Sequence, residues 1–384
     1  MKKLYILLMA GLISSCSDLT DVENNIPEVT TGDVVDVGTR QATIAYTGTI
    51  NQDYYYLELS TSYNFQEGTT IKTVHPTGDQ WNTTGLLPGT TYYYRQCATD
   101  GLTTVNGAVK EFTTLPLVSI NSISLHPWNE PNKLERLYAD PGLGLFYSEA
   151  VSMNDYSGLS NFTITYDNGQ WLMPSDLEPS EGQFLFYAYA PYNAQAKDKT
   201  RIPVSTVKQN IDYLCGSSTM VTAKQCNADI TLHHVLARII FHVSKHPDNN
   251  LDVSVNQYAI CRGLNSGLYF PIEGYLDLVN DTIGDVWHNE YLSRTMNVTT
   301  EITSTPTDME LYVIPFDFMD SQLDFQLSNA NSYTFFRTSV PASSWKAGYQ
   351  YEYPVTVRRN GLEIGDVIIT PWTENNEGNI IIKN

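Results

Sequence analysis

Between residues 27 and 115, apolar and polar residues alternate in short runs that are separated by glycine, asparagine and aspartate. Residues 42–46 form one such run, and residues 55–59 form another in which Tyr55, Leu57 and Leu59 share one face. A period of two places successive side chains on opposite faces of a strand. These runs are therefore predicted to be half-buried β-strands.

A turn and three consecutive tyrosines follow in the sequence PGTTYYYRQCATDG, residues 88–101. Pro88 presets the backbone φ angle of a turn, and Gly89 suits the next position, which needs a positive φ. Alternation along the strand after the turn predicts four inward-facing side chains: Tyr92, Tyr94, Gln96 and Ala98. Three others face the opposite way: Tyr93, Arg95 and Cys97. An inward-facing glutamine needs a hydrogen-bond partner, because buried polar groups are rarely unpaired.

After the dipeptide Leu115-Pro116 the predicted strands become longer and more aromatic. They lie at residues 161–171, 184–193, 229–243, 308–316, 322–328, 351–359 and 366–372. The segment 229–243 fits an amphipathic helix nearly as well, but its isoleucine, valine, phenylalanine and threonine content favours a strand. The roughly 265 residues of this part are more than one small sandwich uses. A division into residues 118–262 and 263–384 is expected at the turn-rich residues 263–267.

The N-terminus has the order of a secretory signal. Lys2 and Lys3 precede an apolar run at residues 4–13, which ends in two serines before Cys16. The run is too short to cross a bilayer, which takes about 20 residues. Residues 12–16 resemble a bacterial lipobox, which implies that Cys16 is lipidated and begins the mature chain; the alternative is a plain cleaved signal. Residues 17–26 are acidic and polar, as in a flexible tether.

Charge excludes one class of partner. The chain has 22 basic and 42 acidic residues and a net charge of −20. Removal of the signal takes away two lysines, so the mature chain carries 20 − 42 = −22. Nucleic-acid binding needs lysine and arginine to neutralise phosphates, so a nucleic-acid partner is not expected. The 26 tyrosines and the absence of long Ala/Leu/Glu/Lys stretches are typical of strands.

Four cysteines remain after lipidation: Cys97, Cys215, Cys226 and Cys261. Cys215 and Cys226 bracket a short polar loop, and export permits a disulfide between them; the alternative is that both stay reduced. The chain has no CxxC spacing, so a structural zinc site is not expected.

Four histidines occur in one segment: His233, His234, His242 and His246. On a single strand they are too far apart to bind one ion, and no nearby carboxylate or cysteine completes a ligand set. Structural histidines, no metal and no cofactor are expected. The sequence has no G-x-S-x-G, H-E-x-x-H or phosphate-binding glycine loop, and nothing singles out a catalytic carboxylate pair. The chain is therefore predicted not to be an enzyme.

Residues 27–115 resemble a fibronectin type III domain. The motif L-x-P-G-T-x-Y ends at Tyr92 and is followed by Tyr94, Arg95 and Ala98, and by Phe-Thr-Thr at residues 112–114. The opening PEVTTGDVVDVGTRQATIAYTGT matches the first two strands of that family. The resemblance implies a β-sandwich in which Tyr92 forms a tyrosine corner, with its hydroxyl bonded to nearby backbone.

The rest of the chain resembles the fimbrillin-like (Mfa-like) family of pilus subunits. The motifs occur in the family's order: DNGQW at 167–171, FYAYAPY at 186–192, DYL at 212–214, HVLARI at 234–239, VIP at 313–315, WKAGYQY at 345–351 and IITPW at 368–372. The resemblance implies an all-β chain with two transthyretin-like β-sandwich subdomains. It also implies a lipoprotein of the outer membrane that joins other fimbrillin-type subunits by strand exchange.

Strand exchange needs a donor strand and an open sheet edge. Residues 379–382 end in three isoleucines, Ile380, Ile381 and Ile382, and they are either the donor or the last strand of their own sheet. Shaft subunits of the family are cut by an arginine-specific protease, which frees the acceptor edge. Arg136 and Arg40 are candidate sites, but a cut at Arg136 would discard the first domain. A subunit that keeps its lipid, as an anchor or a tip adhesin, is favoured.

Two further expectations concern surface chemistry. The sequence Asp-Thr-Ile at residues 281–283 resembles a bacterial O-glycosylation sequon with Thr282 as the acceptor. An alternative function is a glycan-binding lipoprotein of a polysaccharide-uptake system, with exposed aromatic residues such as Trp81 and Tyr93 as the binding platform. A host or bacterial surface receptor is the other partner class. Lipid at Cys16 is the expected membrane attachment.

Overall fold

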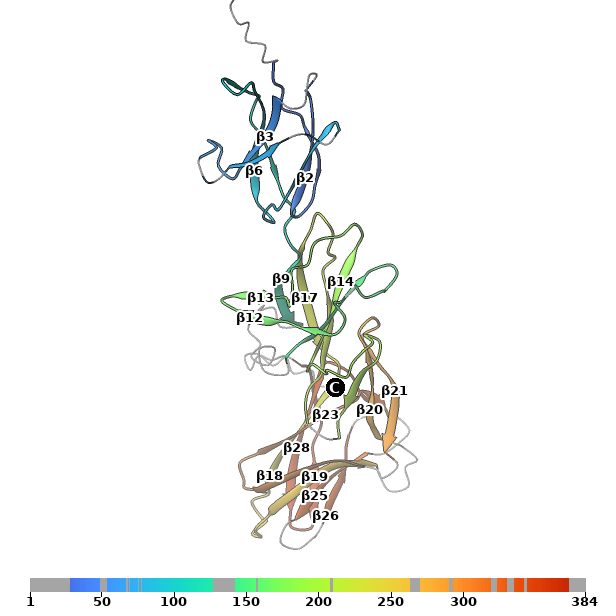
Figure 1. Ribbon diagram of the computed structural model, residues 1–384. Coiled ribbons are helices and arrows are strands. Elements are labelled where there is room, and N and C mark those ends of the chain that lie inside the picture. The colour runs from blue at the N-terminus through green and yellow to red at the C-terminus, as the bar shows by residue number, and fades with distance from the viewer. Residues whose placement is uncertain are drawn as a thin grey trace, which may run out of the picture. The chain divides into compact units, whose positions relative to one another are not determined.

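The chain divides into two compact units, Met1–Pro116 and Leu117–Asn384. The computed structural model describes residues 28–48, 54–66, 68, 70–74, 76, 78–126, 142–156, 158–207, 210–262, 270–289, 293–318, 323–329, 335–341 and 344–372. Every regular element in these residues is a β-strand (Figure 1). The part of the chain described here contains no helix with the length and apolar character that crossing a membrane demands. The chain is all-β, as the sequence predicts.

Unit 1 is a sandwich of two sheets. The first sheet has the order β1-β2-β5, with β1 (Val34–Val37), β2 (Gln41–Ala45) and β5 (Gln80–Thr84). The second has the order β4-β3-β6-β7, with β8 also paired to β6. Its strands are β3 (Tyr55–Ser60), β4 (Thr70–Val74), β6 (Thr91–Thr99), β7 (Thr104–Asn106) and β8 (Lys110–Thr113). Alternate side chains of both sheets form one apolar core, which explains the period of two in the sequence.

The turn before β6 has the predicted geometry. Gly89 has a φ of 59°, and the Tyr92 hydroxyl accepts a hydrogen bond of 2.9 Å from the backbone N–H of Leu87. All four predicted inward side chains of β6 are buried. Gln96 has its partner, because its Oε1 accepts a hydrogen bond from Trp81 Nε1 at 3.3 Å. Cys97 is on the opposite face and is buried as well.

The first layers of unit 2 are a six-stranded and a three-stranded sheet. The larger has the order β11-β10-β14-β16-β17-β9. Its strands are β9 (Ser119–Leu125), β10 (Gly144–Glu149), β11 (Phe162–Thr163), β14 (Phe184–Ala190), β16 (Leu214–Ser218) and β17 (Asn227–His234). The smaller, β15-β20-β21, consists of β15 (Ile202–Ser205), β20 (Phe270–Asp277) and β21 (Thr282–Asn289). A separate hairpin joins β12 (Thr165–Asp167) to β13 (Gln170–Leu172).

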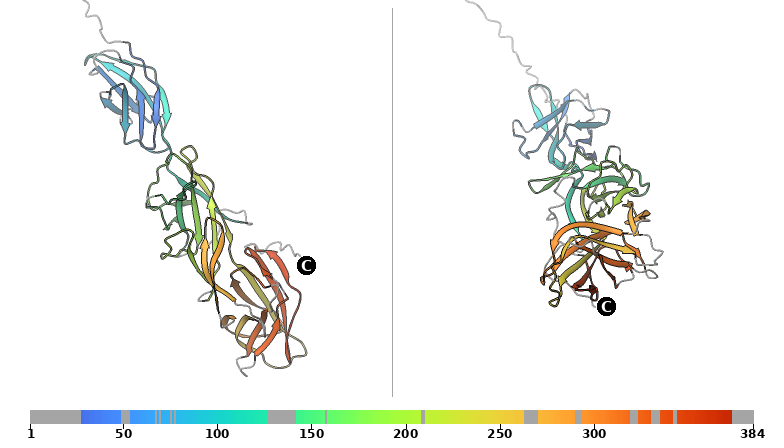
Figure 2. Two further views of the ribbon diagram at one scale, coloured as in Figure 1. Left: turned by 90° about the vertical axis from the view of Figure 1, so that its right-hand side faces the viewer. Right: turned by 90° about the horizontal axis from the view of Figure 1, so that it is seen from below.

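Each face of the six-stranded sheet buries its own apolar cluster. Ile123, Phe186 and Ile230 belong to the cluster on one face. Phe146 and Tyr189 on the other face pack with side chains of β15 and β20. Figure 2 shows the orange strands β20 and β21 beside the green and yellow strands of this sheet in its left view.

The second sandwich of unit 2 packs a five-stranded sheet on a four-stranded sheet. The first has the order β23-β18-β28-β29, with β30 also paired to β28, and the second has the order β22-β19-β25-β26. Phe241 and Phe325 stack across the interior with ring centroids 3.9 Å apart. The strands are β18 (Ala237–Lys245), β19 (Ser254–Arg262), β22 (Ser293–Glu301), β23 (Thr307–Val313), β25 (Leu323–Asn329), β26 (Phe335–Ser339), β28 (Tyr349–Arg358), β29 (Gly361–Ile364) and β30 (Ile368–Pro371). A short pair, β24 (Phe316–Asp317) and β27 (Ser344–Trp345), completes the fold.

Two sequence expectations for unit 2 need correction. Residues 229–243 do not form one strand: β17 ends at His234 and β18 begins at Ala237, in a different sheet. The cores also do not divide at residue 263. The strands β18 and β19 precede that position but contribute to the second sandwich, and β20 and β21 follow it but complete the first. The chain thus passes between the two sandwiches several times.

Candidate functional site

Strand β9 is the edge strand of the six-stranded sheet, and its pairing partner is β17. The two strands run parallel, with Asn227 opposite Ser119 and Leu232 opposite Leu125. The backbone hydrogen bonds extend past both ends of β9: Ser119 N–H donates to the Cys226 carbonyl at 2.9 Å, and His126 N–H donates to the Leu232 carbonyl at 2.7 Å. Main-chain pairing of this kind is the contact that β-strand addition reproduces.

The inward side chains of β9 belong to the core of the sheet. Ile120, Ile123 and Leu125 are all at most 4% exposed. They pack with Ala228, Ile230, Leu232 and other members of the same cluster. Burying apolar side chains of this size contributes roughly 1.5–3 kcal/mol each. Removal of β9 would therefore leave an apolar groove along β17.

The outer edge of β9 faces the β12–β13 hairpin. Asn168 and Gly169 at the hairpin tip have φ angles of 48° and 84°, as a two-residue turn with two positive φ angles requires. A cavity of about 410 Å³ lies between β9 and the hairpin. Its lining comprises Ser119, Ile120, Asn121, Gly169, Gln170, Trp171 and Asn227.

The chain order makes β9 separable from the rest of unit 2. Arg136 lies outside the described residues, but its place in the sequence is between β9 and β10. Every other described strand of unit 2 follows Arg136. A cut there would leave β9 attached to the sheet only through noncovalent contacts. Sequence reasoning missed β9, because Ile120 and Ile123 break the alternation; the register shifts at this point, with Asn121 as the extra residue.

The predicted Cys215–Cys226 disulfide is not present. The structure has Cys97, Cys215, Cys226 and Cys261 as buried free cysteines. Cys215 pairs in register with His233, seven residues along β17 from Cys226. Seven residues of strand correspond to about 23 Å, far beyond the roughly 7 Å that a disulfide spans between Cα atoms. The prediction was wrong because the residues between the two cysteines continue along the sheet before the chain turns back.

Cys215 instead contacts a histidine on the neighbouring strand β17 and an aspartate in a turn of the three-stranded sheet. Its Sγ is 3.5 Å from His233 Nε2 and 3.5 Å from Asp281 Oδ1. Asp281 belongs to the turn between β20 and β21. The expectation that no nearby carboxylate or cysteine completes a ligand set for these histidines is therefore wrong for His233. His233 and Asp281 are 18 and 66 positions from Cys215 in the sequence, so no local spacing motif could have revealed the three residues.

The other three histidines of the segment have protein partners. His234 is buried, with Nδ1 2.9 Å from Asp212 Oδ2 and its ring stacked on Trp372 at 3.6 Å between centroids. His242 lies between Asp308 and Glu352, at 2.6 and 3.0 Å. Hydrogen bonds that His242 donates to Glu352 and to Asp308 raise its pKa to about 9. His246 Nδ1 is 3.5 Å from Asp248 Oδ2. These contacts fit structural roles.

One known protein family matches the larger part of the chain. The model of the "Fimbrillin-like" family matches residues 139–372, which is more than half of the sequence. The chain belongs to the fimbrillin-like family.

Solved structures of low sequence identity are similar to this chain. A "putative cell adhesion protein" of Bacteroides ovatus is 14% identical with a TM-score of 0.50, and the match covers 68% of this chain and 99% of that one. A fimbrial protein of Bacteroides vulgatus is 16% identical with a TM-score of 0.47, covering 67% of this chain and 100% of that one. No curated protein matches the sequence.

The remaining predicted sites of this fimbrillin-like chain lie on its surface or outside the described residues. Arg40 is half-buried in the tight turn between β1 and β2, where Gly38 N–H donates to the Gln41 carbonyl at 2.9 Å. Thr282 is exposed at the start of β21, directly after the β20–β21 turn. Cys16 and the candidate donor residues Ile380, Ile381 and Ile382 lie outside the described part of the chain.

The expected aromatic platform of unit 1 is not formed by the predicted pair. Trp81 is fully buried in the core, so its expected exposure is wrong. Its position on β5 alternates with exposed Asn82 and places the indole next to Gln96. Tyr93 is half-buried and meets Tyr63 edge to face at 5.5 Å between ring centroids. The glycan-binding alternative thus loses one of its two supporting residues.

Proposed function

We propose that the chain is a lipid-anchored, cell-surface subunit of a pilus, of the anchor or tip type, which joins other fimbrillin-type subunits by β-strand exchange. Membership of the fimbrillin-like family supports a fimbrial role. The Bacteroides ovatus protein of the same fold carries a name for cell adhesion. The observation that carries the proposal is β9, an edge strand that precedes Arg136 and fills an apolar groove along β17.

The chemistry of that groove suits an incoming strand. Loss of β9 would expose the main-chain donors and acceptors of β17 together with Ala228, Ile230 and Leu232. An open edge of this kind captures an extended segment through main-chain hydrogen bonds, and alternate pockets accept its apolar side chains. Residues 379–382, Asn-Ile-Ile-Ile, are the segment that we propose as the donor.

An intact chain would occupy the end of a fibre. While β9 pairs with β17, the acceptor edge is filled from within the same chain. Such a chain could donate its C-terminal segment but could not accept one, so it would terminate the assembly. Lipid on Cys16 would hold that end at the outer membrane, because several acyl chains bury enough methylenes for stable anchoring.

Unit 1 would then be a spacer or a binding module between the lipid and the fimbrillin-like part. We propose a fibronectin type III-type domain, supported by the two-sheet sandwich and by the hydrogen bond from Leu87 to the Tyr92 hydroxyl. A surface receptor or glycan would bind to unit 1 or to unit 2. No aromatic cluster in the described residues favours one unit over the other.

The test uses controlled cleavage. In one variant, residues 134–137 are replaced by the recognition sequence of a specific protease. The uncut protein is expected to stay monomeric, and the cut protein to release the fragment that contains β9 and to form a ladder of SDS-resistant oligomers. Addition of intact chain to cut chain should shorten the ladder, because the intact chain ends each assembly.

A second variant is the matched control. Ser122 and Asp229 are neighbours in the β9–β17 register, so the double substitution S122C/D229C can lock β9 in place with a disulfide. The cut, oxidised variant should remain monomeric, and a reductant should restore the ladder. Deletion of residues 379–384 should abolish it. A cut chain that keeps β9 and stays monomeric, or a ladder that forms equally in the locked variant, would overturn the proposal.

A further inference from the structure

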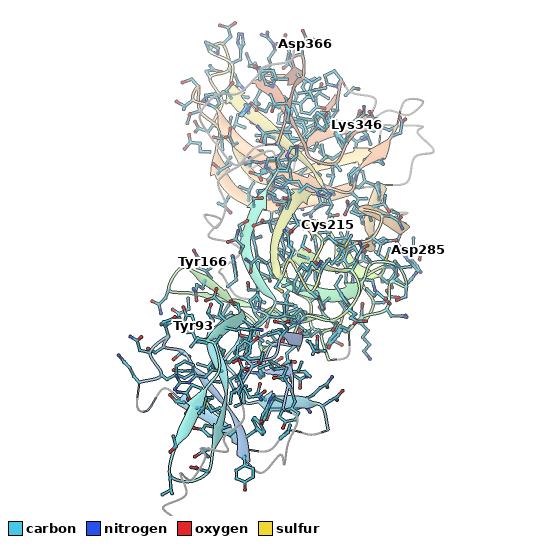
Figure 3. All side chains as sticks on the ribbon, turned by 90° about the horizontal axis from the view of Figure 1, so that it is seen from above. Tyr93, Tyr166, Cys215, Asp285, Lys346 and Asp366 are labelled. Atoms are coloured by element: carbon cyan, nitrogen blue, oxygen red, sulfur yellow. The ribbon has the colours of Figure 1, made fainter. Side chains whose placement is uncertain are left out.

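Three ligand-bearing side chains meet where the six-stranded sheet of unit 2 faces the turn of the three-stranded sheet. Cys215 and His233 are cross-strand neighbours on β16 and β17, and Asp281 comes from the β20–β21 turn. The thiol sulfur, one imidazole nitrogen and one carboxylate oxygen all lie within 4.8 Å of one another. Cys215 is fully buried among the packed side chains of unit 2 (Figure 3), whereas Asp281 is exposed.

We propose that Cys215, His233 and Asp281 form a binding site for zinc or a similar divalent transition-metal ion. Thiolate, imidazole and carboxylate are the protein ligands that zinc takes. With bonds of about 2.3 Å to sulfur and about 2.0 Å to nitrogen or oxygen, tetrahedral geometry separates sulfur from each neighbouring ligand atom by roughly 3.5 Å. Both sulfur separations in the structure are 3.5 Å. The three groups thus need little movement to bind one ion.

A cavity beside the cluster supplies the remaining coordination position. It has a volume of about 500 Å³, and its lining includes His126, His233, His234 and Asp281. This opening, which three histidines and Asp281 help to line, gives an ion and its water a route to the ligands. Three protein ligands with a fourth position open to water is a common arrangement for zinc.

The charge around the thiol also favours a cation. The carboxylate of Asp281 lies 3.5 Å from the Cys215 sulfur. A divalent cation would displace the thiol proton and offset the negative charges of both the thiolate and the carboxylate. The net charge of the whole chain, −20, attracts cations to the protein in general.

Metal binding would add a link between two sheets that pack against each other. Cys215 and His233 belong to the six-stranded sheet, and Asp281 belongs to the turn of the three-stranded sheet. An ion that binds only the folded arrangement stabilises it in proportion to its concentration over its dissociation constant. Zinc is therefore expected to raise the Tm of unit 2.

Cobalt(II) titration of the full chain, kept reduced with a metal-free phosphine, tests the site. Cobalt bound through a cysteine gives a thiolate-to-metal charge-transfer absorption, and zinc should displace it at one equivalent per chain. The variant Cys215→Ser should lose this absorption. His233→Gln and Asp281→Asn should weaken cobalt binding by at least roughly 100-fold. That is the largest loss expected from removing a residue that only hydrogen-bonds to a metal ligand. Asp281 is exposed, so Asp281→Asn leaves the fold intact and keeps the test decisive if Cys215→Ser does not fold.

Two matched controls exclude general thiol or surface binding. Cys226 is a buried thiol whose sulfur contacts only the backbone carbonyls of Thr222 and Ala223 among the contacts described for it. Half-buried His246 and exposed Asp248 form a histidine–carboxylate pair. The variants Cys226→Ala and His246→Ala should bind cobalt with unchanged affinity and absorption. Absence of the charge-transfer band at stoichiometric cobalt, or equal binding by Asp281→Asn and the parent chain, would overturn the proposal.

Discussion

Tyr92 and Tyr93 are adjacent in sequence but have different surroundings in unit 1. Tyr92 is buried, and its hydroxyl accepts the hydrogen bond from Leu87 N–H. Tyr93 faces the other side of β6 and contacts Tyr63 through its ring. The hydroxyl of Tyr92 therefore contributes to the stability of the turn, whereas the ring alone of Tyr93 makes the described contact.

Removal of the Tyr92 hydroxyl is expected to destabilise unit 1. Tyr92→Phe leaves the Leu87 N–H without its acceptor, which costs about 1–2 kcal/mol. Tyr93→Phe removes a hydroxyl with no described hydrogen bond and should change the free energy of unfolding by less than about 0.5 kcal/mol. Urea denaturation of the two variants measures the difference, and equal effects would contradict the assigned role of Tyr92.

His242 gives unit 2 a pH-dependent contribution to stability. Hydrogen bonds that His242 donates to Glu352 and then to Asp308 raise its pKa to about 9, and the hydrogen bond from His242 lowers the pKa of Glu352. A raised pKa means that the folded state holds the proton more tightly than the unfolded state, whose histidine titrates near 6.5. The stabilisation is therefore complete below about pH 6.5 and is lost as the pH rises through about 9.

A comparison with His242→Gln isolates this contribution. Below about pH 6.5, the unfolding free energy of the parent chain should exceed that of the variant by about 1–2 kcal/mol. This is less than the full pKa shift implies, because solvent screens the exposed Asp308. Above about pH 9 the difference should vanish. Urea denaturation on both sides of this pH range provides the measurement, and a difference that is constant with pH would rule out the ion pair as its source.

At the scale of elements, Trp372 fixes the end of β30. Its ring stacks on His234 and on Tyr312, with centroids 3.6 and 5.3 Å away, and its backbone N–H donates to the Gly348 carbonyl at 2.8 Å. His234 ends β17, so one indole joins the last described strand to the point where the chain leaves the first sandwich.

Trp372→Ala should therefore destabilise unit 2 strongly. Truncation of a buried tryptophan costs about 3–5 kcal/mol. Trp287, on β21, is 68% exposed and provides the control. Trp287→Ala should change the stability by less than about 0.5 kcal/mol. Chemical denaturation of both variants compares them, and a small effect of Trp372→Ala would show that β30 is not anchored by this side chain.

The elements also show how far sequence patterns reach. In unit 1, regular alternation and turn residues predicted β2, β3, β6 and the turn before β6, where Gly89 and Tyr92 act locally. The break at Val235 and Leu236 has no glycine or proline, and both residues are apolar because they are buried between β17 and β18. The pattern therefore predicted one continuous strand. The convergence of Cys215, His233 and Asp281 depends on β20 and β21 returning to the first sandwich, which no local pattern encodes.

At the scale of the whole molecule, the apolar clusters of the described residues do not cross the division after Pro116. One cluster uses residues 29–112, and the other three use residues 118–369. Domains with separate cores can unfold separately. Two transitions are therefore expected in calorimetry of the full chain. Tyr92→Phe should lower the temperature of one transition and Trp372→Ala that of the other. A single transition that both substitutions lower equally would mean that the two units fold as one cooperative body.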